Sequence, residues 1–327
     1  MMDWYECING GEELYTCIDG PDIGKRLIKA GGKTIWKSDD LLCENELLNN
    51  NIINEPIAGN DRFFKERLVK RSRLVICGAG YVGEAVAALG KKIGFDVTVI
   101  DEREEFLKGA EESAGVAGLC MEFGEALESI VSDENTYFVI VTRGHSRDIA
   151  CLDKTMKKEA AYIGMMGSKK RCQRAKDEMK ARGYDAGKIH APIGIDIGAE
   201  TPEEIAVSVI GEIISVKNRC FKGEPWSDII AGLKKNKDEG VVCVLATIVS
   251  KSGSAPRSVG TRMLIGDNGV NVGTIGGGYI ESEVFKTAKK MLSDNEKSFV
   301  LKEYGTVSEE ENTGCGGRVE IFFEKIA

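Results

Sequence analysis

Three glycines near the middle of the chain have the spacing of a phosphate-binding turn. Gly78, Gly80 and Gly83 follow an apolar run typical of a buried strand and precede an apolar helical pattern. In such a turn the first glycine permits the tight bend and the second lets a pyrophosphate approach the backbone. The third lets the helix pack closely on the strand. The spacing predicts a phosphate at the helix N-terminus, and a fold of this kind that binds nothing is the alternative.

An acidic residue stands where this turn needs one. Asp101 ends the next predicted strand, about 20 residues beyond the turn, where a carboxylate can accept hydrogen bonds from a ribose. Arg103 would suit a phosphorylated ribose, although a surface arginine is the simpler account. A nucleotide-containing ligand is therefore expected, and NAD(P) belongs to this class.

Two segments of the same region join cations to glycines after a predicted strand. Arg143 and His145 follow the run at 137–142, which predicts that they face the glycine turn. His145 is a candidate acid or base, or else a solvated residue of a capped turn. Gly167, Ser168 and Lys169 open a helix, which predicts an anion site, with a basic surface turn as the alternative.

The C-terminal third contains hydroxyl, guanidinium and thiol groups in glycine-rich loops. Ser254 and Arg257 share a loop that suits phosphate or carboxylate. Gly276, Gly277 and Gly278 lead into a helix and predict a second anion site. Cys315, followed by Gly316, is a thiol among glycines, which makes it a candidate nucleophile or a ligand for a soft metal.

The elements that position these residues predict an α/β protein. Strands alternate with helices over 71–222, which predicts a doubly wound, Rossmann-like parallel sheet. A hairpin, a helix at about 279–292 and a last strand predict a smaller α/β domain over 223–327. Residues 1–70 carry no motif and form a poorly defined segment, with a small α/β unit as one option.

Composition excludes several classes of function. The net charge is −8 and no basic block occurs, which argues against a nucleic-acid partner. No apolar run approaches the roughly 20 residues that span a bilayer, and the N-terminus lacks the pattern of a signal peptide, so we expect a cytoplasmic protein. The ten cysteines form no C-x-x-C pair, and two histidines cannot build a histidine-rich metal site.

Together these motifs resemble the XdhC/CoxI family, the maturation factors of molybdenum hydroxylases such as xanthine dehydrogenase. The resemblance covers about 70–327. The matching segments are 74–80, 142–145, 162–171, 191–204, 253–257, 273–278 and 315–318.

The resemblance implies a protein that binds the molybdenum cofactor (molybdopterin, with or without a nucleotide), assists its sulfuration and inserts it into an apo-hydroxylase. Such a protein acts as a cofactor-binding chaperone more than as a turnover enzyme. Cys315 would be the thiol nearest the molybdenum. A cysteine desulfurase is a further expected partner, and a homodimer is the expected assembly.

The chain also departs from the family pattern. The small domain usually comes first but here follows the Rossmann-like domain. Tyr81 and Arg147 stand where histidines are expected, and 312–314 replaces a glycine–methionine pair. An NAD(P)-dependent oxidoreductase is the alternative function, but it offers only His145 for acid–base chemistry and gives the Cys315 loop no role.

Overall fold

The computed structural model describes residues 3–8, 10–39, 56–57, 61–220, 225–255, 257–294, 297–305 and 317–327. The chain divides into two compact units. Arg71–Lys222 forms the first, called here the Rossmann unit, and Met1–Lys70 with Gly223–Ala327 forms the second. The N-terminal segment therefore packs with the C-terminal third of the chain.

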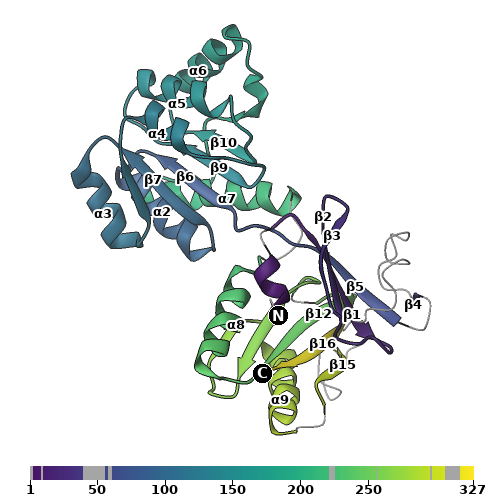
Figure 1. Ribbon diagram of the computed structural model, residues 1–327. Helices are drawn as coiled ribbons and strands as arrows, with labels where there is room; N and C mark the ends of the chain where they lie inside the picture. The colour runs from purple at the N-terminus through teal and green to yellow at the C-terminus, as the bar shows by residue number, and fades with distance from the viewer. Residues whose placement is uncertain are drawn as a thin grey trace. The chain divides into compact units, whose positions relative to one another are not determined.

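The Rossmann unit contains a six-stranded parallel sheet, as the sequence predicted (Figure 1). Its strand order is β11-β10-β9-β6-β7-β8, so the chain builds outward from β6 in one direction and then returns to add β9 on its other side. Ligands of such sheets bind at this switch point, beyond the carboxyl ends of the strands. The strands are β6 (Arg73–Cys77), β7 (Asp96–Asp101), β8 (Ala117–Cys120), β9 (Thr136–Ile140), β10 (Tyr162–Met165) and β11 (Ile189–His190).

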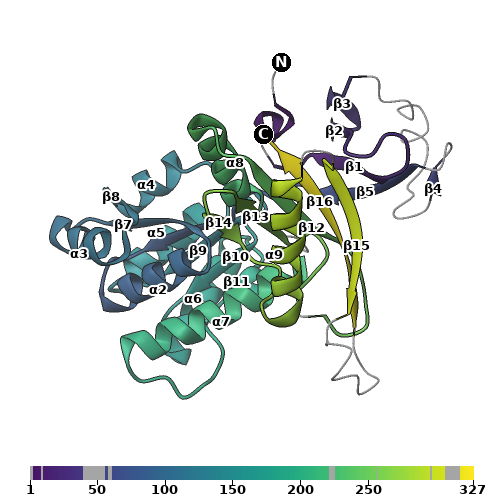
Figure 2. The same cartoon turned by 90° about the horizontal axis from the view of Figure 1, so that it is seen from below.

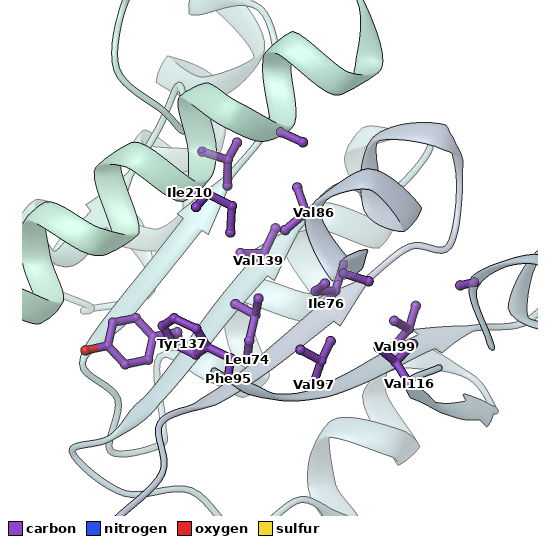
Figure 3. Packing of buried hydrophobic residues seen from close by; sticks show 14 of the residues in the cluster. Leu74, Ile76, Val86, Phe95, Val97, Val99, Val116, Tyr137, Val139 and Ile210 are labelled. Carbon is purple, nitrogen blue, oxygen red and sulfur yellow. The ribbon is translucent and has the colours of Figure 1, made fainter. Parts of the chain in front are cut away.

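Helices cover both faces of this sheet because its strands are apolar on both sides. On one face Leu74, Ile76 and Val139 point toward Val86 and Ile210 of the helices (Figure 3). The helices of that face are α2 (Tyr81–Lys92), α3 (Glu104–Ala114) and α7 (Pro202–Cys220). The helices of the other face are α4 (Phe123–Ser129), α5 (His145–Thr155) and α6 (Lys169–Ala181).

The second unit contains two antiparallel five-stranded sheets with the orders β3-β2-β1-β5-β4 and β14-β13-β12-β16-β15. The first is built from β1 (Glu13–Asp19), β2 (Arg26–Ala30), β3 (Lys33–Lys37), β4 (Pro56–Ile57) and β5 (Asp61–Arg67). The second is built from β12 (Cys243–Ser252), β13 (Arg262–Gly266), β14 (Asn271–Gly273), β15 (Phe299–Gly305) and β16 (Arg318–Ile326). A 3-10 helix, η1 (Trp4–Cys7), and the helices α8 (Ser227–Glu239) and α9 (Gly278–Ser293) complete the unit.

The central strand β12 is buried on both faces of its sheet. Val244 and Ala246 pack with α9 on one face, and Figure 2 shows this helix lying along the sheet. Cys243 and Leu245 alternate with them and pack on the other face, with α8 and residues of the first sheet. The two sheets of this unit therefore share a core.

Residues 1–70 differ from the α/β unit suggested above. Their described part forms an antiparallel sheet and η1. Gly31 and Gly32, both with positive φ, close the hairpin between β2 and β3. Ile18 and Phe64 pack against Val249 of β12, which gives the small sheet the core that it lacks by itself. No helix in the described ranges is long and apolar enough to cross a membrane.

Candidate functional site

The glycine turn has a conformation that only small residues permit. Gly78 has φ 116°, in the region that favours glycine. A β-carbon on Gly83 would lie 1.9 Å from the carbonyl oxygen of Gly78, so this position tolerates no side chain. Gly80 is the N-cap of α2, and a β-carbon there would meet no atom within 4 Å. The backbone at Gly80 is therefore open to a ligand.

A cavity of about 560 Å³ adjoins this turn at the switch point of the sheet. It is lined by the turn from Gly78 to Gly83 and by the segments that follow β7 and β9. Four arginines also line it: Arg103, Arg143, Arg147 and Arg171. Guanidinium groups match the geometry of phosphate oxygens, so the cavity has the composition of an anion site.

Asp101, the predicted ribose ligand, is buried and already accepts four hydrogen bonds. Its Oδ2 accepts from the Ala79 amide at 2.8 Å and from Arg103 Nη2 at 2.8 Å. Its Oδ1 accepts from the Arg103 amide at 3.1 Å and from Arg103 Nε at 2.8 Å. Burial opposes ionisation, but the donors from Arg103 and Ala79 outweigh it and lower the pKa of Asp101. A ribose hydroxyl would need one of these donors to leave.

Two further arginines of the cavity have carboxylate partners. Arg147 donates to Glu102 at 2.8 Å, and Arg171 donates through Nε to Asp148 at 2.6 Å. Asp148 is fully buried and also accepts from the Thr142 hydroxyl at 2.7 Å. Burial raises the pKa of Asp148 against these two partners.

Arg143 is the unbalanced charge of the cavity. Its side chain is exposed and, within the described part of the chain, makes no hydrogen bond or ion pair. Its guanidinium carbon lies 5.4 Å from the centre of the Phe106 ring, and that of Arg103 lies 3.9 Å from the same centre. The sequence predicted Arg143 as a site residue, and in the described part of the chain no carboxylate compensates its positive charge.

His145 and the Gly167–Lys169 loop lie beside the cavity but are not among its lining residues. Nε2 of His145 is 3.3 Å from Glu178 Oε2 on α6. Ser168 accepts a hydrogen bond from the Arg171 amide and so caps α6 itself. Lys169 is exposed on the first turn of that helix. The cation of this segment that reaches the cavity is Arg171.

In the second unit, the chain's own carboxylate occupies the predicted anion cradle. Glu281 accepts hydrogen bonds from the Thr274 hydroxyl at 2.5 Å and from the Gly277 amide at 2.9 Å. These donors lower the pKa of Glu281. The glycines from Gly276 to Gly278 therefore hold the start of α9 against an internal anion, and a phosphate would have to displace it.

The loop of Ser254 and Arg257 is exposed at the end of β12. A β-carbon on Gly317 would lie 2.2 Å from the carbonyl oxygen of Ser254, so the chain just before β16 runs against this loop. Cys315 and Gly316 lie outside the described residues. No group of three or more metal-binding side chains occurs among the residues whose placement is given.

Sequence reasoning did not place Arg147 in the cavity, whereas Arg103 was an option for a phosphorylated ribose and Arg171 follows directly on the predicted anion site at Gly167–Lys169. Arg147 and Arg171 lie one helical turn or less inside α5 and α6, immediately after the strand ends that face the switch point. That register was a usable signal, because the first turns of such helices surround the ligand crevice.

Two family models match the chain in succession. The XdhC Rossmann domain matches residues 74–213, and the XdhC and CoxI family matches residues 237–305. The chain belongs to the XdhC and CoxI family. As an XdhC protein it carries the Rossmann domain before the CoxI-type region, in the order that its sequence predicted.

Among similar proteins, the uncharacterized protein YqeB of Escherichia coli K12 is 36% identical over 157 residues, 47% of this chain and 29% of that protein. A probable xanthine dehydrogenase subunit of Bacillus subtilis 168 is 29% identical over 161 residues, 48% of this chain and 46% of that protein. The chain thus spans less than half the length of these relatives.

A solved structure described as a xanthine dehydrogenase from Bacillus halodurans is similar in fold. It superposes with a TM-score of 0.52 at 21% identity, over 67% of this chain and 63% of that chain. At this identity the similarity supports the fold alone.

Proposed function

We propose that this XdhC protein is an accessory factor that binds the molybdenum cofactor by its phosphate and delivers it to a xanthine dehydrogenase-type hydroxylase. The arginine-lined cavity at the glycine turn carries the proposal. Membership of the XdhC family and partial similarity to a probable xanthine dehydrogenase subunit support a role beside such an enzyme. The arginines of the cavity have the chemistry to bind a phosphorylated cargo.

The residues present fit a phosphate. The open backbone at Gly80 is the N-cap of α2, where amides and the helix dipole favour an anion. Arg143 adds a charge that no carboxylate neutralises within the described residues. The cargo supplies the metal chemistry, and the cavity residues bind and orient it.

The second unit carries the Cys315 thiol, and we propose that this thiol assists sulfuration of the cargo. Gly317, two residues beyond Cys315 in the sequence, packs on the exposed loop of Ser254. A Cys315→Ala variant is expected to keep its pterin and to lose the ability to activate an apo-hydroxylase. Full activation by this variant would remove the thiol from the proposal.

The oxidoreductase alternative has less support. Its one acid–base candidate, His145, faces Glu178 and does not line the cavity. Asp101, its expected ribose ligand, is fully engaged by Ala79 and Arg103.

The test is cofactor co-purification. The full chain is purified without oxygen from molybdenum-supplied cells, bound molybdenum is measured by mass spectrometry, and pterin is measured by its fluorescence after iodine oxidation. Wild type should carry both, and Arg143→Ala should lose most of them. Arg182→Ala is the matched control, because Arg182 pairs with Asp153 and Glu178 outside the cavity lining.

Wild-type protein that carries neither pterin nor molybdenum, yet binds NAD(P) saturably and transfers hydride, would overturn the proposal in favour of the oxidoreductase.

A further inference from the structure

The cavity contains a carboxylate that is closed to ligands and two arginines beside it that are not. Asp101 receives two donors on each oxygen, which fills the roughly four acceptor positions of a carboxylate. A ribose diol binds such a residue by donating two hydroxyl hydrogens. In this protein the side chain of Arg103 already takes one position on each oxygen.

Arg103 is held in place but keeps donors to spare. Its Nε and Nη2 each donate one hydrogen to Asp101, and its guanidinium lies against Phe106. Of the five N–H donors of a guanidinium, about three then remain. The side chain is 31% exposed, so these donors are accessible from the cavity that it lines.

Arg143 approaches the same aromatic ring. Its guanidinium carbon is 5.4 Å from the ring centre of Phe106, and both arginines line the cavity. Arg103 is neutralised by Asp101, whereas Arg143 has no carboxylate partner among the described residues. The two guanidinium groups lie near the same Phe106 ring, and together with Asp101 they carry one net positive charge. This arrangement suits an anion with several oxygens.

We propose that Arg103 and Arg143 form a seat for a phosphomonoester and that Arg103, by closing Asp101, excludes an unmodified ribose diol. The cavity then selects ligands that end in a phosphate monoester at this position. That group can be the 2′-phosphate of a dinucleotide or the terminal phosphate of a pterin. The second source rests on the proposed function, and the first does not.

The test uses two ligand pairs that differ only in the phosphomonoester, with binding to the full chain measured by titration calorimetry or fluorescence anisotropy. One pair is NADP⁺ and NAD⁺. The other is the fluorescent iodine-oxidation product of molybdopterin before and after phosphatase treatment. In at least one pair the phosphorylated member should bind about tenfold to a hundredfold more tightly, as expected for a charged hydrogen-bonding group.

Variants assign this preference to the two arginines. Arg143→Ala should abolish the preference, and Arg182→Ala should leave it unchanged. Arg103→Ala frees one position on each oxygen of Asp101, so NAD⁺ affinity should rise as NADP⁺ affinity falls. Thermal unfolding checks each variant, and if Arg103→Ala does not fold, Arg143→Ala decides the outcome, because its side chain is exposed.

Equal binding within both pairs, or a preference that survives Arg143→Ala, would overturn the inference. A preference confined to the nucleotide pair supports the seat while counting against the pterin cargo. A preference in the pterin pair supports both. The failure of the seat and the failure of the proposed function are thereby distinguished.

Discussion

The two units place arginine side chains in opposite environments. In the Rossmann unit, Arg103, Arg147 and Arg171 each pair with a carboxylate at the wall of a cavity. Their side chains remain 31%, 48% and 31% exposed. Each pair therefore leaves guanidinium donors within reach of a ligand.

In the second unit, two arginines are buried away from solvent. Arg26 donates through Nη1 to Glu324 at 2.7 Å, and Arg262 pairs with Glu66. The two arginines are 4% and 2% exposed, and each lies over a tryptophan ring. Both pairs join the N-terminal segment to the C-terminal third of the chain.

Burial separates the two roles. A pair whose arginine is partly exposed keeps donors for an anion, even where its carboxylate is buried, as at Asp101 and Asp148. A buried pair costs desolvation on both sides, and loss of one partner leaves a charge without compensation. The cavity arginines are thus suited to ligand binding, and the buried ones fix how two distant segments meet.

Breaking a buried pair should have the largest effect. Glu66→Ala removes the carboxylate opposite Arg262 and should destabilise the second unit by about 3–5 kcal/mol. Trp4, Trp36 and Trp226 all belong to that unit, so tryptophan fluorescence in urea reports its unfolding separately. Unfolding unchanged from wild type would show that the pair does not hold the two segments together.

Two glycine variants test whether the Rossmann cavity binds through its backbone. Gly83→Ala should destabilise that unit by about 1–3 kcal/mol, because its β-carbon overlaps the Gly78 carbonyl oxygen. Gly80→Ala has free space and should change stability by less than about 0.5 kcal/mol. Calorimetry measures both. Gly80→Ala should nevertheless weaken the binding of phosphorylated ligands, because its methyl group stands where a ligand would approach the backbone. Binding equal to that of wild type would mean that the turn has a structural role only.

A carboxylate that fills an internal cradle should contribute less. Glu281→Gln should cost about 1 kcal/mol, the usual value of a helix cap. The hydrogen bond from Thr274 and those from backbone amides lower the pKa of Glu281 from 4.5. A carboxylate whose pKa is lowered by folding stabilises the folded state above pH 4.5. This stabilisation is lost as the pH falls through the lower pKa of the folded state. The variant should therefore show a flatter loss of stability below pH 4.5, and identical pH profiles would refute this role.

The smallest effect is expected at an exposed pair of the second unit. Arg318 and Glu303 are 69% and 59% exposed and 3.0 Å apart. Arg318→Ala should change the urea midpoint by an amount equivalent to less than about 1 kcal/mol. A cost near that of Glu66→Ala would mean that burial does not separate the two kinds of pair.

Local pattern was sufficient to predict the Rossmann unit. Its apolar strands, the glycine turn and the Thr201–Pro202 helix start each specify an element without distant partners. The antiparallel sheet of residues 1–70 was missed, because short strands with mixed polarity gain stability only against β12 and β16.

By itself the sequence determined the family, the parallel sheet and the glycine turn, and it predicted Arg143, which lines the cavity, as a site residue. Tertiary structure decided which cations serve the cavity. In the folded protein Arg103 pairs with Asp101, and Arg147 and Arg171 line the cavity. His145 lies against Glu178 of α6. Residue type and spacing predict which groups can bind, but the partners that satisfy a charge come from other elements. Which charges remain free for a ligand is therefore settled only when those elements pack.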